Sequence, residues 1–263
     1  MAITPAPSGL LLVGHGTDDK QGQAAMLEVS QQVARLLPDV AVEPACLELS
    51  RPTISEAIAT LAAHGVHQLT AVPVLLFAAG HVKRDIPLAV EQAAREHRIP
   101  HVRMAPHLGC HPAVVRLSTE RFLEAVPKWG AIAKDETLLL FVGRGSRDPE
   151  ANSDLAKFAR LRWEQTPVGW LETCYLAMTQ PTLADGLRFA SSLPYRRIVV
   201  QPHLLFSGVL ANRVAEAIDA ARREHPGKEW ILVGPLGTGE QIAQVIVEQG
   251  LGGRNSEGSA TIK

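Results

Sequence analysis

The sequence has 263 residues, of which 46% are hydrophobic and 20% are charged, as is typical of a globular protein with one large domain or two ordinary ones. Its formal net charge of −1 gives no general attraction for nucleic acid or an anionic membrane surface. The 3 widely spaced cysteines indicate neither a disulfide framework nor a cysteine-based zinc site. Because no signal-peptide pattern occurs and no apolar segment approaches the ~20 residues that span a bilayer, we expect a cytoplasmic protein without membrane or nucleic-acid partners.

Strands and helices are expected to alternate through the first half of the chain. Short apolar segments predict strands at residues 9–14, 40–49, 72–77 and 101–105. Apolar residues at helical spacing and start signals such as a Thr53–Glu56 capping box predict helices at 21–37, 53–64, 83–97 and 112–126. A βαβαβαβα order favours a parallel, doubly wound sheet.

The same pattern then begins again in the second half. Three landmarks recur at one constant offset along the chain: Gly14 as Gly143, Pro52 as Pro181, and Pro73 as Pro202. We therefore expect an α/β protein made of two similar flavodoxin-like domains with a cleft between them, each a four-stranded parallel sheet of order 2-1-3-4 flanked by helices. The expected boundaries are 1–130 for an N-terminal domain with the active site, 131–250 for a degenerate copy, and 251–263 for a flexible tail. Duplication also favours a monomer with pseudo-twofold symmetry.

The two copies differ where chemistry is expected. At the offset of the repeat, His15 becomes Arg144, Glu48 becomes Ala177, and His81 is replaced by Leu210. A purely structural role for the histidines would be expected to recur with the scaffold. The comparison therefore favours one active copy and one supporting copy.

His15, Glu48 and His81 all follow strand ends that meet at one edge of the predicted sheet. Ligands in open parallel sheets bind at that edge, where the strand order reverses. Two imidazoles and a carboxylate suit a divalent first-row metal and can accept protons near neutral pH. Taken singly, each histidine has the alternative of a loop or capping role, and Gly14-x-Gly16 alone is weak evidence for phosphate binding.

Basic residues also gather on the expected strand-end loops. Arg51, Lys83, Arg84 and Arg144 are individually ordinary surface charges. Their common position favours a polyanionic ligand.

These segments resemble the class II chelatases, in the branch of sirohydrochlorin cobaltochelatases and ferrochelatases. The resemblance lies in 13–17 (VGHGT), 47–52 (LELSRP), 72–87 (VPVLLFAAGHVKRDIP) and, for the two-domain form, 143–146 (GRGS). It implies insertion of Co²⁺ or Fe²⁺ into sirohydrochlorin, on the route to cobalamin or siroheme. It also implies that His15 and His81 form the metal-binding catalytic pair and that Glu48 assists them. Some longer family members carry a histidine-rich tail or an iron–sulfur motif, and since this sequence has neither, we expect no iron–sulfur cluster or other tightly bound cofactor.

Two alternatives belong to other functional classes. One is a metal or tetrapyrrole carrier without turnover. The other is a metal-dependent phosphate-ester hydrolase, which is disfavoured because the expected site lacks the several carboxylates of a two-metal centre. The metal stays open among Co²⁺, Fe²⁺ and Ni²⁺, since affinity order alone would favour nickel.

Overall fold

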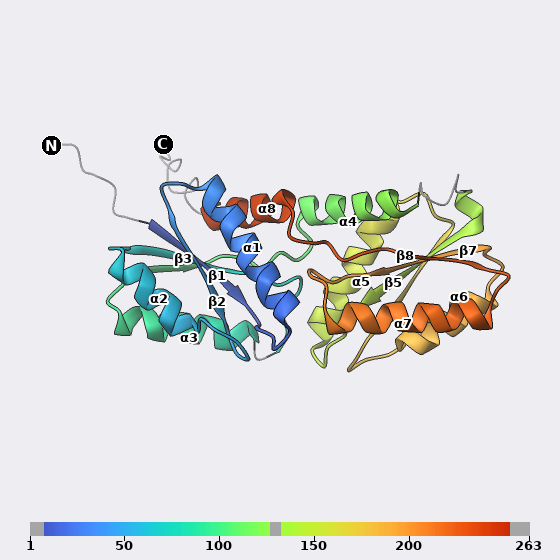
Figure 1. Cartoon of the computed structure of the whole chain (residues 1–263), viewed down its shortest axis with the longest axis horizontal. Helices are drawn as coiled ribbons and strands as arrows, with labels where there is room; N and C mark the ends of the chain where they lie inside the picture. The colour runs from blue at the N-terminus through green and yellow to red at the C-terminus, as the bar shows by residue number, and fades with distance from the viewer. Residues whose placement is uncertain (1–7, 81, 127–132, 253–263) are drawn as a thin grey trace, which may run out of the picture. The chain divides into compact units, whose positions relative to one another are not determined.

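The computed structural model describes residues 8–80, 82–126 and 133–252, and it divides into two compact units (Figure 1). The first unit comprises the chain up to Leu108 together with the chain from Thr238 onward. The second unit is the continuous segment Gly109–Gly237. Each unit is an α/β layer structure built on its own parallel sheet.

The first unit contains a four-stranded sheet in the order β2-β1-β3-β4, as the sequence predicted. Its strands are β1 (Ser8–Gly14), β2 (Ala41–Cys46), β3 (Gln68–Pro73) and β4 (His101–Met104). Its helices are α1 (Lys20–Leu36), α2 (Ile54–Ala63), α3 (Val82–Glu96) and α8 (Glu240–Leu251). Helices α1 and α8 pack together, as do α2 and α3, whose apolar residues share a buried core with alternate residues of β1 and β3.

The second unit repeats this plan with a sheet in the order β6-β5-β7-β8. Its strands are β5 (Thr137–Gly143), β6 (Trp170–Tyr175), β7 (Arg197–Pro202) and β8 (Glu229–Leu232). Its helices are α4 (Pro112–Ala125), α5 (Pro149–Glu164), α6 (Leu183–Ser192) and α7 (Val209–Glu224), with a short 3-10 helix η2 (Lys134–Glu136) before β5. This arrangement confirms the expected fold class.

The duplication extends to irregular backbone. Leu49 and Met178, which are equivalent positions of the repeat, both have positive φ, at 64° and 65°. The Arg51–Pro52 and Gln180–Pro181 peptide bonds are both cis. The two halves thus share loop conformation as well as strands and helices.

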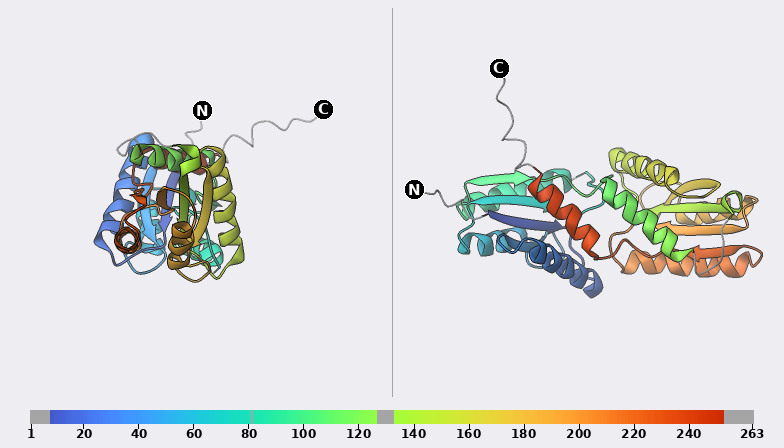
Figure 2. Two further views of the ribbon diagram at one scale, coloured as in Figure 1. Left: turned by 90° about the vertical axis from the view of Figure 1, so that its right-hand side faces the viewer. Right: turned by 90° about the horizontal axis from the view of Figure 1, so that it is seen from above.

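The fourth helices of the two halves are exchanged. Helix α4 follows β4 in the sequence but belongs to the second unit, where it packs on α5. Helix α8 follows β8 but packs on α1 and β3 of the first unit, and Figure 2 shows α8 running beside the strands of that unit. The sequence prediction placed the division near residue 130 from the repeat alone, whereas the compact units divide the chain at Leu108 and Gly237.

A buried polar network fixes α4 in the second unit. Arg162 of α5 is fully buried, and it donates to the hydroxyls of Ser118 (2.9 Å) and Thr119 (2.7 Å) on α4 and to Gln201 Oε1 (3.0 Å) on β7. Burial lowers the pKa of Arg162 to about 10. An arginine charge with only neutral acceptors among the described residues is costly to bury unless its donors are satisfied, so α4 is held by the oxygens that it supplies.

The first unit has apolar residues at the same positions. Val33 and Val72 are the equivalents of Arg162 and Gln201 in the repeat, and both are fully buried. Helix α8 brings Gly250 against this surface, where an added Cβ would lie 2.8 Å from a methyl carbon of Leu10. The polar face of α4 therefore fits the second sheet, and the face of α8 that carries Gly250 fits the apolar surface of the first sheet.

Two predicted strands end earlier than expected. The apolar run from Val72 does not form one long strand, because β3 begins at Gln68 and ends at Pro73. Val74 N still donates to Val13 O (2.8 Å), but β1 ends at Gly14, so β3 has no further strand residues of β1 to pair with. Strand β2 ends at Cys46 instead of Leu49, since the chain turns at the positive φ of Leu49.

Across the described ranges, no helix combines the length and apolar character needed to cross a membrane.

His203 lies beside the Arg162 network and is almost completely buried. Its ring packs on Phe158 and Phe141, with centroids at 4.1 and 5.3 Å. Burial, and secondly the positive charge of Arg162, lower the pKa of His203 from 6.5 to about 3. The folded protein therefore holds this imidazole neutral over a pH range in which an unfolded chain would protonate it.

This difference predicts a specific pH dependence of stability. Between about pH 6.5 and pH 3 the unfolded state binds one more proton at His203 than the folded state, so the free energy of unfolding decreases as the pH falls, by at most about 1.4 kcal/mol per pH unit. Urea unfolding at pH 7, 6, 5 and 4 measures this slope. The His203→Leu variant should have a shallower slope in the same range, and equal slopes would contradict the assignment.

Candidate active site

Two of the predicted site residues meet at the carboxyl edge of the first sheet. His15 follows β1 and Glu48 follows β2, and these strands are neighbours. The distance from His15 Nε2 to Glu48 Oε1 is 3.2 Å, and the two side chains are 25% and 50% exposed. An imidazole and a carboxylate are therefore in contact where solvent and ligands can reach both. The third predicted residue, His81, lies outside the described residues.

The β1–β2 pairing continues past the strands and positions both side chains. Leu47 N donates to Gly14 O, and Glu48 N donates to His15 O, each at 3.0 Å. The backbones that carry His15 and Glu48 are thus joined directly. Their side chains lie next to each other because their main chains are in ladder register.

Gly16 makes this close approach sterically feasible. Its φ is +96°, and a Cβ added there would lie 1.7 Å from Glu48 O. Gly145 has the same relation to Ala177 O in the second unit, at 2.0 Å. The second copy lacks the histidine and the carboxylate but keeps the glycine, so the glycine is needed for the tight turn. This agrees with the expectation that Gly14-x-Gly16 is weak evidence for phosphate binding.

Ser50 braces the same two loops, and sequence reasoning missed it. Its Oγ accepts from Thr17 N and donates to Cys46 Sγ, both at 3.2 Å. In the second unit the residue equivalent to Thr17, Ser146, donates its backbone N–H to Asn152 Oδ1 instead. The signal that could have revealed Ser50 is its place two residues after Glu48, but a serine in a turn is common.

The predicted substrate-binding cations lie on strand-end loops or first helical turns. Arg51 is highly exposed and pairs with Glu56 of the α2 capping box at 2.8 Å. The Thr53 backbone N–H, and more weakly the charge of Arg51, hold the pKa of the Glu56 carboxyl below its usual range. Lys83 and Arg84 lie in the first turn of α3, and Arg144 follows β5 as an exposed residue of the second unit. Their role in binding a ligand stays a prediction.

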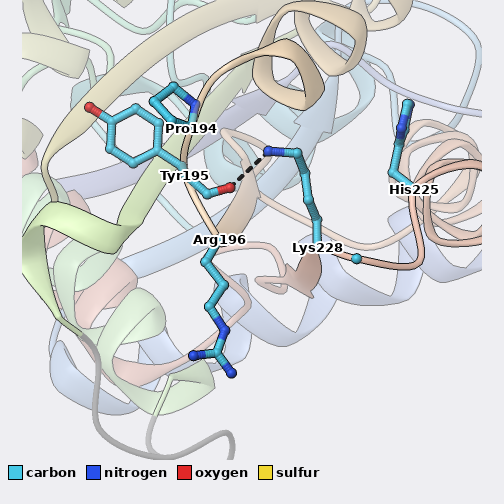
Figure 3. Close-up of a pocket in the computed structure, with 6 residues that line it drawn as sticks. Pro194, Tyr195, Arg196, His225 and Lys228 are labelled. Carbon is cyan, nitrogen blue, oxygen red and sulfur yellow. Dashed lines mark hydrogen bonds between the residues drawn. The ribbon is translucent and has the colours of Figure 1, made fainter.

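Two other features of the described residues add no residue to this site. Within the part of the chain that the structure describes, no group of three or more His, Cys, Asp or Glu side chains is arranged to hold a metal. A hollow in the second unit lies at the amino ends of β7 and β8, and Figure 3 shows Lys228 in it, donating to Tyr195 O (2.8 Å). Lys228 also donates to Leu193 O (2.7 Å), so its ammonium group ties backbone segments together.

Comparison with known proteins decides the family. The CbiX family profile matches residues 9–125 and 138–250. The chain belongs to the CbiX family, a family of class II chelatases. The match covers both halves, which confirms the resemblance predicted from the motifs and agrees with the internal duplication.

The chain is similar to two curated proteins of Priestia megaterium that differ in metal. It is 31% identical to a sirohydrochlorin cobaltochelatase over 250 residues, which is 94% of this chain and 80% of that protein. It is 30% identical to a sirohydrochlorin ferrochelatase over 241 residues, which is 91% of this chain and 88% of that protein. The near-equal identities do not choose between cobalt and iron.

The fold is also that of a solved structure, SirB from Bacillus subtilis with Fe³⁺. The TM-score is 0.83 at 24% identity, with 96% of this chain and 98% of that chain covered. This CbiX chain therefore has the chelatase-like fold over nearly its whole length.

The contact at Gly16 predicts a large loss of stability on substitution. Gly16→Ala should cost on the order of 3–5 kcal/mol, because the methyl group would collide with a backbone carbonyl at a positive φ. Gly65→Ala is the matched control, since Gly65 has φ +77° but open space around an added Cβ, and it should cost only about 1 kcal/mol. Denaturant unfolding of both variants measures the difference, and similar losses would show that the close approach is unimportant.

Proposed function

We propose that this protein is a sirohydrochlorin chelatase, an enzyme that inserts Co²⁺ or Fe²⁺ into sirohydrochlorin. The observation that carries the proposal is the His15–Glu48 contact, at 3.2 Å, on the ligand-binding edge of a CbiX-family domain. The similarity to a cobaltochelatase and a ferrochelatase supports the reaction class. In this proposal the enzyme serves cobalamin synthesis if it inserts cobalt and siroheme synthesis if it inserts iron.

Metal insertion requires groups that hold a metal ion and accept protons. Sirohydrochlorin loses two pyrrole N–H protons as the divalent metal sheds its waters and bonds to the ring nitrogens. In our proposal His15 and His81 bind the incoming metal, and each takes up one of these protons once the metal has passed to the ring nitrogens and left its imidazole nitrogen free. Glu48 orients the His15 imidazole. Neutral imidazoles suit both tasks because their ordinary pKa lies near neutrality.

The His15–Glu48 distance is compatible with metal delivery. Nitrogen and oxygen ligands lie about 2.0–2.2 Å from a divalent first-row metal, so two adjacent ligands on one ion are about 3.0–3.5 Å apart. The 3.2 Å between Nε2 and Oε1 falls in this interval. The Glu48 carboxylate can therefore stay beside the His15 imidazole while that imidazole holds the ion, without a large rearrangement.

Basic residues on strand-end loops and first helical turns are available to bind the ligand's acidic groups. Sirohydrochlorin carries many peripheral carboxylates, and we propose that Arg51, Lys83, Arg84 and Arg144 contribute to binding them. Arg51 would exchange its surface ion pair with Glu56 for a substrate carboxylate at little cost, since exposed ion pairs contribute little. We further propose that the protein acts as a monomer without a tightly bound cofactor.

An anaerobic absorbance time course tests the function directly. Wild-type protein with sirohydrochlorin and either Co²⁺ or Fe²⁺ should metallate well above the spontaneous rate. His15→Ala should lower the rate about 100-fold or more, and Glu48→Gln about tenfold, because one removes a ligand and proton acceptor and the other only its partner. His67→Ala, an exposed histidine at the opposite edge of the sheet, is the control and should keep full activity.

The same assay separates the alternatives. Full activity of His15→Ala with an unchanged unfolding curve would contradict the site. A tight spectral shift on adding sirohydrochlorin, without acceleration by wild-type protein, would indicate a carrier. Hydrolysis of a phosphate ester without any response to sirohydrochlorin would favour the hydrolase.

The Ser50 brace predicts a smaller effect on the same reaction. Ser50→Ala removes the hydroxyl that joins the His15 and Glu48 loops, so kcat should fall about tenfold while KM for sirohydrochlorin stays within twofold. Ser50→Thr keeps the hydroxyl and should restore kcat. If Ser50→Ala raised KM alone, Ser50 would be a substrate contact and not a brace.

A further inference from the structure

Leu49 is an exposed apolar residue in an unfavourable backbone conformation beside the candidate site. It directly follows Glu48, has φ +64°, and is 59% exposed. Left-handed backbone is costly for residues with a Cβ and is normally given to glycine or asparagine. A large apolar side chain thus occupies a position where burial does not explain it.

The second copy shows which part of this feature belongs to the scaffold. Met178, at the equivalent position, has φ +65° and is 63% exposed. The turn therefore requires left-handed backbone in both copies. Both copies also carry an exposed apolar side chain there, although glycine would satisfy the same turn at lower cost. In the first unit this side chain belongs to the residue next to Glu48, so it lies beside the candidate site.

The loop that carries Leu49 is held on both sides. Cys46 N donates to Pro52 O, and Ser50 N donates to Glu48 O, each at 2.8 Å. Ser50 Oγ adds its bonds to Thr17 N and Cys46 Sγ. Leu49 is thus presented at the tip of a braced turn, one residue from the carboxylate that contacts His15. A braced apolar contact positions a ligand with little loss of side-chain and loop entropy.

We propose that Leu49 is a substrate-positioning residue that packs against the apolar face of the tetrapyrrole ring. This inference rests on the proposed chelatase function. A conjugated ring with carboxylates only at its periphery has two apolar faces, which an apolar side chain can cover. Leu49 holds the ring over the His15–Glu48 pair, and water leaves both surfaces as they meet.

Four single variants test the contact. Leu49→Ala and Leu49→Gly should each raise KM and Kd for sirohydrochlorin about tenfold, with kcat within twofold, because a buried leucine side chain is lost from the complex. Leu49→Met, which carries the side chain that the second copy uses, should keep wild-type values. Leu27→Ala is the matched control, since Leu27 of α1 is 51% exposed, and it should change nothing.

The glycine variant distinguishes binding from a structural role. Leu49→Gly relieves the left-handed backbone, so its urea midpoint should be at least that of Leu49→Ala while its affinity for sirohydrochlorin is reduced. Wild-type KM and Kd in both variants would overturn the contact. The absorbance of sirohydrochlorin without metal measures direct binding. Tight binding by wild-type protein without metallation would count against the chelatase function alone. No binding by wild-type protein would overturn both the chelatase function and the Leu49 contact.

Discussion

The candidate site depends on the close approach of two backbones at the end of the β1–β2 ladder. Glu48 N reaches His15 O, and Gly16 lies so near Glu48 O that no side chain could fit between them. This main-chain contact places the His15 and Glu48 side chains beside each other, and their imidazole and carboxylate lie 3.2 Å apart. Positioning the two side chains through the backbone costs little conformational entropy, because the sheet already orders the backbone atoms involved.

The second unit keeps this backbone without its chemistry. Gly145 approaches Ala177 O as Gly16 approaches Glu48 O, and Met178 turns as Leu49 does. Arg144 replaces the histidine at the same place in the loop. The strand-end loops therefore have the same backbone conformation in both copies, while the residues at the positions of His15 and Glu48 differ.

Much of this could be predicted from local sequence pattern. The alternation of strands and helices, the internal repeat and the neighbouring positions of His15 and Glu48 follow from periodicity and from the rules of parallel sheets. The end of β3 at Pro73 could not, since an apolar run has the same composition inside a sheet and in a buried loop. The exchange of α4 and α8 also escaped prediction, because it depends on contacts between residues such as Arg162 and Ser118 that are far apart in sequence. Ser50 was missed for a similar reason, as its bond to Thr17 joins two loops.

The helix exchange has a consequence for the order in which the protein folds on the ribosome. The second unit is a continuous segment, Gly109–Gly237, and its elements are all synthesised before α8. The first unit, which carries His15 and Glu48, lacks α8 over α1 and β3 until the last part of the chain emerges. The half that is made first is thus completed last, and its uncovered apolar surface is exposed to chaperones for as long as the second half takes to translate.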